Sequence, residues 1–316
     1  MLNERPLGKT ELDVSEISLG AWQIGGRGYG PVSKADADAT IKAYLEAGGN
    51  FIDTARRYGN SEARLGDYFC RNGGRQEVII ASKTHRLAPK AIRQELEESL
   101  RRLETDYIDL YYLHAPPDDP DEMHRVLDTY ETLKQEGKIR AIGASIKGPD
   151  VTQATVDLCR QYINTGRVDV LMVIYSIFRQ KNADIFAEAA ANGVGIVART
   201  VLESGFLTGK YELGHEFDAE DDHRVRWGQE RVDRILAEGR RLGRWAIAQP
   251  YDSLAQVAIR FTLDSEEISS VVVGARTAEQ IKESLQAASL PPLSTNLRQR
   301  LIKTFRGQSE SFNTGT

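Results

Sequence analysis

The sequence predicts an α/β fold, a (β/α)8 TIM barrel with an N-terminal β-hairpin cap and a long loop insertion after the seventh strand. Short apolar, β-branched runs alternate with amphipathic helical patterns through almost all of the 316 residues, which is typical of a parallel sheet built from βα units. About eight such runs occur, the number that closes this kind of barrel. No G-x-G-x-x-G fingerprint opens the first βα unit, as an open dinucleotide-binding sheet would require. We therefore expect residues 1–316 to form a single barrel domain.

The predicted strands and helices follow an N-terminal hairpin. Residues 2–14, with Gly8 and Lys9 at the turn, are predicted to form this hairpin and to cap the bottom of the barrel. Helix 34–47 ends at the C-cap signal of two glycines, and Pro89 suits the first turn of helix 89–104. The predicted strands are 16–20, 50–54, 77–83, 107–114, 139–145, 168–175, 195–200 and 268–274. The other predicted helices are 121–138, 149–165, 183–191, 277–288 and one that follows the insertion as far as residue 245.

Two loops interrupt the regular alternation. Four glycines between residues 25 and 30 lack the spacing of a phosphate fingerprint, so we interpret them as a loop that leads to a helix start at Pro31 and Ser33. Segment 211–227 is acidic and then mixed in charge, and it lies between the seventh and eighth strands. Long insertions in βα loops of a barrel usually serve the active-site face. We expect this segment to bring to that face the side chains of His215, Asp221, His223, Arg224 and Trp227.

Composition and charge argue against several classes of protein and partner. The net charge of -5 gives no basic field, so a nucleic acid is not expected as a partner. Cys70 and Cys159 lie far apart without CxxC spacing, which predicts neither a disulfide framework nor a zinc site and fits a reducing cytoplasm. The first residues lack the features of a signal peptide, and no apolar run reaches 18 residues. We expect a cytoplasmic protein, a monomer or small homo-oligomer, with no membrane partner.

Polar residues close several of the predicted strands. Asp53 ends the second strand and Tyr58 follows it, Lys83 ends the third, His114 the fourth and Ser145 the fifth. Taken singly, each has an ordinary structural interpretation. Asp53 would be a turn carboxylate and Tyr58 a loop aromatic, Lys83 would lie on the surface, and His114 would be a structural histidine. On successive strands of one barrel, however, they would converge on one pocket. There a lysine ammonium would lower the pKa of the tyrosine, and a carboxylate would hold that lysine in place. The tyrosine would then serve as a general acid–base near neutral pH.

Segments along nearly the whole chain resemble the aldo-keto reductase superfamily. They are GKTELDVSEISLGAWQIGG, NFIDTARRYGNSEARLG, VIIASK, YIDLYYLHAPP, GKIRAIGAS, GFLTGKY and VVVGARTAEQIKESL, in that order. The resemblance implies that Asp53, Tyr58, Lys83 and His114 are the catalytic tetrad, with Tyr58 as the proton donor or acceptor. It also implies hydride transfer between NAD(P)H and a carbonyl carbon, with His114 orienting the carbonyl oxygen, and it implies that Trp22 lines the substrate pocket.

The resemblance also implies where the cofactor binds. Ser145 matches the family's grip on the nicotinamide, whereas Met172 replaces its usual Gln and Arg199, followed by Thr200, replaces an aromatic residue. The planar Arg199 is able to stack on an aromatic ring or to pair with a phosphate. The remaining positions that the resemblance assigns to the cofactor are Leu202, Gly274, Arg276, Gln280, Glu283 and Ser284. Because Arg276 near a 2′-phosphate would favour NADP, we expect NADP, with NAD as the alternative.

Two other functions fit the same scaffold. The first is a cofactor-binding regulatory or sensor protein, similar to potassium-channel β subunits, against which the intact tetrad argues. The second is an aldolase that uses Lys83 as a Schiff base, in which Tyr58 would have no role. No set of His, Asp and Glu with ligand spacing predicts a metal. For the substrate, the polar residues of the insertion favour a sugar or polyol among small carbonyl compounds.

Overall fold

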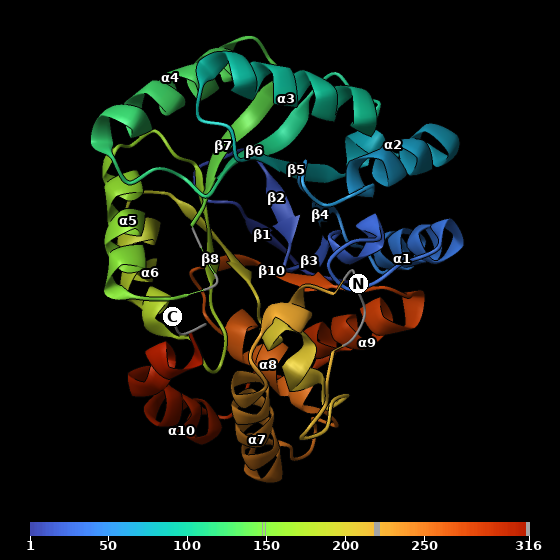
Figure 1. Ribbon diagram of the computed structural model, residues 1–316, viewed down its shortest axis with the longest axis vertical. Coiled ribbons are helices and arrows are strands. Elements are labelled where there is room, and N and C mark those ends of the chain that lie inside the picture. The colour runs from blue at the N-terminus through green and yellow to red at the C-terminus, as the bar shows by residue number, and fades with distance from the viewer. Residues whose placement is uncertain (147, 149, 218–221, 314–316) are drawn as a thin grey trace.

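The barrel is the centre of the structure. A computed structural model describes residues 1–146, 148, 150–217 and 222–313. Eight parallel strands close on themselves in the order β10-β3-β4-β5-β6-β7-β8-β9, which confirms the predicted fold (Figure 1). Their bounds are β3 Ile17–Gly20, β4 Phe51–Asp53, β5 Ile79–Thr84, β6 Ile108–His114, β7 Ile139–Ser145, β8 Val170–Ile174, β9 Gly195–Arg199 and β10 Ile268–Gly274.

The N-terminal hairpin is formed by β1 (Glu4–Pro6) and β2 (Asp13–Ser15), which pair antiparallel as predicted. Gly8 lies in the connection with φ 59°, a left-handed conformation that glycine adopts without strain. The buried side chains of Leu7, Leu12 and Val14 join the apolar cluster inside the barrel. Because that cluster includes Phe51 at the start of β4, the hairpin covers the N-terminal end of the barrel. The C-terminal end is left open.

Most helices lie where the patterns predict them. They are α1 Lys34–Glu46, α3 Pro89–Leu103, α4 Pro120–Gln135, α5 Gln153–Asn164, α6 Phe186–Ala191, α7 Gln229–Ala246 and α9 Ala278–Ser289. Ser33 caps α1 as expected, because its side chain accepts a hydrogen bond from the backbone N–H of Asp36. Helix α5 begins later than predicted, because Thr152 and Thr155 form a capping box at its start. Pro149, where that helix was expected to begin, lies outside the described residues.

Three further helices have no counterpart in the predicted set: α2 Ser61–Asn72, α8 Leu254–Leu263 and α10 Thr295–Phe305. Every residue of α8 is buried, including Gln256 and Arg260, which stand one helical turn apart, and Ser253 caps the helix by accepting from the Gln256 N–H. Helix α2 carries Gly66, which lowers helix propensity but allows close contact with α3, since a Cβ there would lie 2.3 Å from the Arg102 carbonyl oxygen. Helix α10 buries only Leu301 and Phe305.

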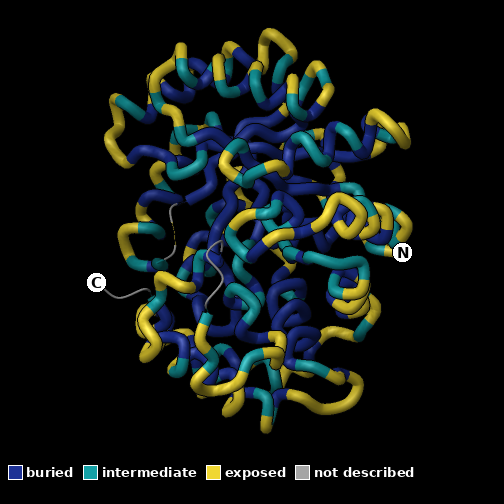
Figure 2. The backbone as a smooth tube through the Cα atoms, turned by 45° about the vertical axis from the view of Figure 1, so that its right-hand side comes forward, coloured by how far each residue is buried: buried dark blue, intermediate teal, exposed yellow. Residues whose placement is uncertain are grey.

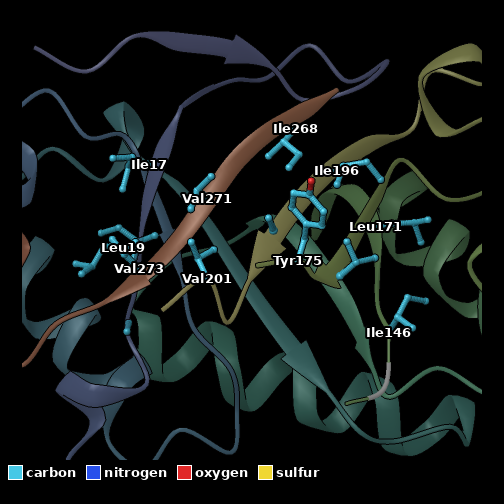
Figure 3. Packing of buried hydrophobic residues seen from close by; sticks show 14 of the residues in the cluster. Ile17, Leu19, Ile146, Leu171, Tyr175, Ile196, Val201, Ile268, Val271 and Val273 are labelled. Carbon is cyan, nitrogen blue, oxygen red and sulfur yellow. The ribbon is translucent and has the colours of Figure 1, made fainter. Parts of the chain in front are cut away.

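The core has two layers. One cluster fills the barrel, and a larger one lies between the outer face of the strands and the helices. Figure 3 shows part of the larger cluster, with Ile17 and Leu19 of β3 close to Val271 and Val273 of β10. In Figure 2 the buried residues follow the strands and the inner sides of the helices, and exposed residues lie on the outer surface. None of the described helices is long and apolar enough to cross a membrane.

Both ends of the described chain are attached to the barrel. The Leu2 N–H donates to the carbonyl of Ala47, and the Asn313 side chain both donates to and accepts from the backbone of Val151. We therefore propose that residues 1–316 form one domain.

Candidate active site

A cleft of about 920 Å³ lies at the C-terminal ends of the barrel strands. Residues from all eight strand ends or from the loops after them line it, as expected for a parallel barrel. Of the residues predicted from the sequence, Lys83 lies beneath the surface of the cleft. The others that line it are Trp22, Asp53, Tyr58, His114, Ser145, Met172, Arg199, Thr200, Leu202, Gly274, Arg276, Gln280, Glu283 and Ser284. The cleft therefore brings the predicted residues together.

Lys83 and Asp53 form a buried ion pair below Tyr58. The Lys83 Nζ lies 2.7 Å from the Asp53 carboxylate, and these side chains are 0% and 5% exposed. Parallel pairing of β4 with β5 sets this distance, because the two residues stand near the ends of adjacent strands. Nζ also donates to the Thr54 carbonyl at 2.6 Å and to the Tyr58 hydroxyl at 3.4 Å. Being buried and paired, Lys83 is poorly suited to form a Schiff base with a substrate in the cleft.

The protonation state of Tyr58 differs from the one expected from the sequence. Burial raises the pKa of Tyr58 above its ordinary value, and the opposing effect of the Lys83 charge is smaller. The expectation of a lowered pKa was therefore wrong. It considered the ammonium but not the removal of the phenol from water, nor Asp53, whose negative charge also raises the pKa of Tyr58. At neutral pH the Tyr58 hydroxyl carries its proton.

His114 faces Tyr58 across the cleft. It is the last residue of β6, and its ring lies 6.0 Å from the Tyr58 ring, nearly perpendicular to it. Burial, together with the Lys83 charge, holds the pKa of His114 far below its ordinary value, so the imidazole is neutral. The next residue, Ala115, has φ 71°, which is rare for a residue with a side chain and typical of functional sites.

Trp22 and the glycine-containing loop after β3 form the wall beside Tyr58. The Trp22 ring stacks on the Tyr58 ring at a centroid distance of 5.5 Å and an interplanar angle of 19°. Gly25 is required for this packing, because a Cβ at that position would lie 1.9 Å from the Tyr58 carbonyl oxygen. As interpreted from the sequence, this segment is a loop and not a phosphate fingerprint.

The predicted nicotinamide residues lie on neighbouring strands. Ser145 of β7 pairs in register with Met172 of β8. Arg199 of β9 donates to the Ile146 carbonyl at 3.0 Å and to the Thr200 hydroxyl at 3.3 Å. Burial lowers the pKa of Arg199, and its charge is close enough to lower the pKa of Tyr58. The guanidinium therefore lies near the tyrosine end of the cleft.

The segment after β9 has an unusual backbone. Thr200, Glu203 and Ser204 have φ values of 64°, 49° and 55°, and Leu202, which lines the cleft, lies between the first two. A buried ion pair holds this segment: Arg179 Nη2 lies 2.6 Å from the Glu203 carboxylate, which also accepts from the Ser176 hydroxyl. The Glu203 and Gly205 N–H groups donate to the carbonyls of Thr200 and Leu202, so turns within the segment also fix its shape.

The loop after β10 carries the residues predicted to bind the adenosine phosphate. The Arg276 N–H donates to the Gln280 side chain at 2.9 Å, and the Arg276 guanidinium donates to the Pro31 carbonyl at 3.0 Å. Among the described residues, no carboxylate forms an ion pair with Arg276. Glu283 and Ser284 lie on α9, which begins beside this loop. The guanidinium is thus available to pair with a phosphate.

The insertion after β9 reaches across the cleft to the loop after β3. The His223 N–H and ring Nδ1 both bond the Gly28 carbonyl, at 3.0 and 2.7 Å, and Asp222 forms a 2.6 Å ion pair with Arg224. His223, Arg224 and Trp227 line the cleft as expected. His215 does not line it, because its ring packs behind the wall against Tyr211 and Phe217. Asp221 lies outside the described residues.

Several residues that line the cleft were not predicted. His85 follows the end of β5, Arg57 precedes Tyr58, and Arg179 and Arg231 reach the cleft from further along the chain. His85 and Arg57 stand within two residues of predicted ones, so inspecting the first loop residues as well as the strand ends would have found them. Arg179 and Arg231 lie in segments whose position only the folded chain reveals. Among the described residues, no group of three His, Cys, Asp or Glu is arranged to hold a metal.

Comparisons with known proteins agree with this geometry. Residues 16–301 match the family model described as Aldo/keto reductase family. The NADH-specific methylglyoxal reductase of Escherichia coli (strain K12) is 29% identical over 317 residues, which cover 90% of this chain and 93% of that protein. The holo form of an aldo-keto reductase from Bacillus halodurans superposes with a TM-score of 0.77 at 26% identity, over 98% of this chain and 100% of that one. The glycerol dehydrogenase of Gluconobacter oxydans superposes with a TM-score of 0.75 at 25% identity, over 96% of this chain and 95% of that one.

Proposed function

The chain belongs to the aldo/keto reductase family and is an NAD(P)-dependent oxidoreductase, and we propose that Tyr58 is the general acid–base of its reaction. One observation carries this proposal. The Tyr58 hydroxyl lies in the cleft, 3.4 Å from the ammonium of a fully buried ion pair and opposite a neutral histidine. A phenol so placed exchanges a proton with substrate oxygen and not with bulk water.

The charges of the cleft suit a dinucleotide phosphate. Among the described residues, seven arginine and lysine side chains line the cleft against two carboxylates, although the chain as a whole has a net charge of -5. Among the described residues Arg276 has no carboxylate partner, and its guanidinium donates only to the Pro31 carbonyl. We assign the nicotinamide to Ser145, Met172 and Arg199. We assign the adenosine phosphates to the loop after β10 and the start of α9, with Gly274, Gln280, Glu283 and Ser284. The phosphate bridge would cross Thr200 and Leu202.

Each side chain of the site has a separate role in the proposed reaction. When bound, the nicotinamide supplies or accepts the hydride. Tyr58 gives its proton to the substrate oxygen as negative charge develops there, and in the opposite direction it takes that proton back. Lys83 stabilises the phenolate that remains, and Asp53 fixes the position of Lys83. His114, being neutral, donates a hydrogen bond to the same oxygen and orients the carbonyl.

The cofactor and substrate preferences are part of the proposal. We propose NADP as the preferred cofactor, because the Arg276 guanidinium would form a charge-assisted contact with a 2′-phosphate that NAD lacks. The Escherichia coli relative is named NADH-specific, so this preference would distinguish the two proteins. We also propose a sugar or polyol as substrate. The polar side chains of His223 and Arg224 line the cleft, and one structural relative is a glycerol dehydrogenase.

The test replaces Tyr58 with Phe. Turnover should fall by about 10²- to 10⁴-fold, the usual contribution of a general acid. Cofactor affinity, measured by fluorescence titration, should stay within a few-fold, because the phenol acts on the substrate. Tyr112→Phe is the matched control: its hydroxyl is buried in the barrel beneath the site without a hydrogen-bond partner among the described residues. A Tyr58→Phe variant that keeps most of its activity would show that another group is the acid.

A further inference from the structure

His85 stands beside His114 in the cleft and has no role in the reaction proposed above. It follows β5 directly, and its ring centroid lies 3.9 Å from that of His114, with an angle of 45° between the rings. In both rings Nδ1 is buried and has no hydrogen-bond partner among the residues that the structure describes. The Nε2 atoms are not buried in this way and have no partner among the described residues. Since both residues line the cleft, Nε2 is the nitrogen that each ring presents to a ligand.

Both rings are neutral. Burial lowers the pKa of His85, and the positive charges of Arg57 and Lys83 lower it further, with Glu95 opposing them. Because the buried Nδ1 has no described partner, the neutral ring carries its proton on Nε2, which then donates one hydrogen bond to a hydroxyl or carbonyl oxygen. Protonation of the ring would place a second N–H at the buried Nδ1, where the described part of the chain offers no acceptor. His85 therefore presents one uncharged hydrogen-bond donor to an oxygen in the cleft.

We infer that His85 determines specificity by binding an oxygen on the carbon next to the reacting carbon. The inference rests on the proposed function, in which Tyr58 and His114 hold the reacting oxygen. Two adjacent imidazoles then present two Nε2 atoms to two adjacent oxygens. The substrate class that fits is a carbonyl compound with oxygen at the neighbouring carbon, such as a 2-hydroxyaldehyde, and in the opposite direction a 1,2-diol.

The test compares two aldehydes of nearly equal size. 2-Hydroxypropanal and 2-methylpropanal differ by a hydroxyl in place of a methyl group, so the ratio of their kcat/KM values reports on the second oxygen. In His85→Phe this ratio should fall roughly three- to tenfold, the loss expected for one hydrogen bond. The kcat/KM for 2-methylpropanal should change little. His85→Gln keeps a polar atom at about the reach of Nε2 and should restore part of the ratio.

His215→Phe is the matched control, because His215 belongs to the insertion after β9 but does not line the cleft, and its ring packs against Tyr211 and Phe217. This variant should leave the ratio unchanged. A ratio that His85→Phe does not alter, while both aldehydes are still reduced, would overturn the inference and leave the proposed function intact. So would a ratio lost in Arg57→Ala and kept in His85→Phe, because Arg57 would then bind the second oxygen. Failure of the wild type to reduce any of a wider panel of aldehydes would refute both proposals.

Discussion

The buried pair of Lys83 and Asp53 should behave as one unit in mutagenesis. Lys83→Met removes the ammonium from a position 2.7 Å from the carboxylate and leaves a negative charge in a pocket where the Asp53 side chain is only 5% exposed. Asp53→Leu instead leaves an unpaired ammonium on the fully buried side chain of Lys83. In the double variant neither charge remains, and two apolar side chains fill the space.

The magnitudes follow from this burial. Loss of one partner of a buried pair costs about 3–5 kcal/mol, because the other charge is left unpaired, whereas replacement of both by apolar residues is often nearly neutral. We expect the double variant to be more stable than either single variant, with a coupling free energy of about 3 kcal/mol or more. Burial already raises the pKa of Asp53, and loss of Lys83 raises it further. The folded Lys83→Met variant then binds more protons than its unfolded chain, so its stability should fall as pH rises above about 4.

Urea unfolding of the four proteins at pH 5.5 and pH 7.5 measures both effects. The loss of folding stability caused by Lys83→Met should be greater at pH 7.5 than at pH 5.5. As the pH rises, keeping the unpaired Asp53 protonated costs more free energy, and ionising it leaves an unpaired charge in the protein interior. Activity separates stability from function: the double variant should fold and remain nearly inactive, since Tyr58 has lost the ammonium beside it. Additive destabilisation by the two single changes would refute the assignment of Lys83 and Asp53 as a coupled pair.

Three further predictions concern the rest of the cleft. The pKa of Tyr58 is raised and that of His114 lowered, so neither should titrate between about pH 6 and pH 9, and kcat for carbonyl reduction should show no loss from Tyr58 until the pH exceeds about 10. A decline in this rate near neutral pH would contradict the raised pKa. Arg276→Ala should weaken NADPH about tenfold or more and NADH little, as measured by fluorescence titration. Equal weakening of NADPH and NADH would contradict the proposed preference for NADP. Arg199→Tyr should lower the dissociation constant of the oxidised cofactor relative to the reduced one, because the wild-type cation disfavours a positive nicotinamide ring. If the ratio of the two dissociation constants does not change, the charge of Arg199 does not act on the nicotinamide ring.

The barrel was predictable because its strands are local. Each strand is a short β-branched run between helices, so the alternation is visible in the sequence. A closed barrel was favoured over an open sheet because no phosphate fingerprint opens the first βα unit. Helix α8 was not predictable in the same way. It has only 10 residues, most of them apolar, so its few polar residues give a weak pattern, and a short, largely apolar segment resembles a strand as much as a helix.

The site was predictable in its residues and less so in its electrostatics. Strand ends converge in any parallel barrel, which is why Asp53, Lys83 and His114 could be grouped before the fold was known. Whether the pKa of Tyr58 is raised or lowered depends on how completely the folded chain removes the phenol from water. The sequence pattern does not give the burial of this side chain. His85 was missed for a simpler reason, since it lies one residue beyond the end of β5.

The distribution of charge explains how a negatively charged protein suits a negatively charged cofactor. Net charge reports on the whole surface, whereas binding depends on the potential within the cleft. Most of the surface ion pairs lie on the outer helices, as with Arg93 and Glu136 on α3 and at the end of α4. Among the cations of the cleft, Arg179 and Arg224 are paired with Glu203 and Asp222, whereas Arg276 forms no ion pair with a carboxylate of the described residues. A phosphate that approaches Arg276 therefore meets a guanidinium that no internal carboxylate has to release first, which favours its binding.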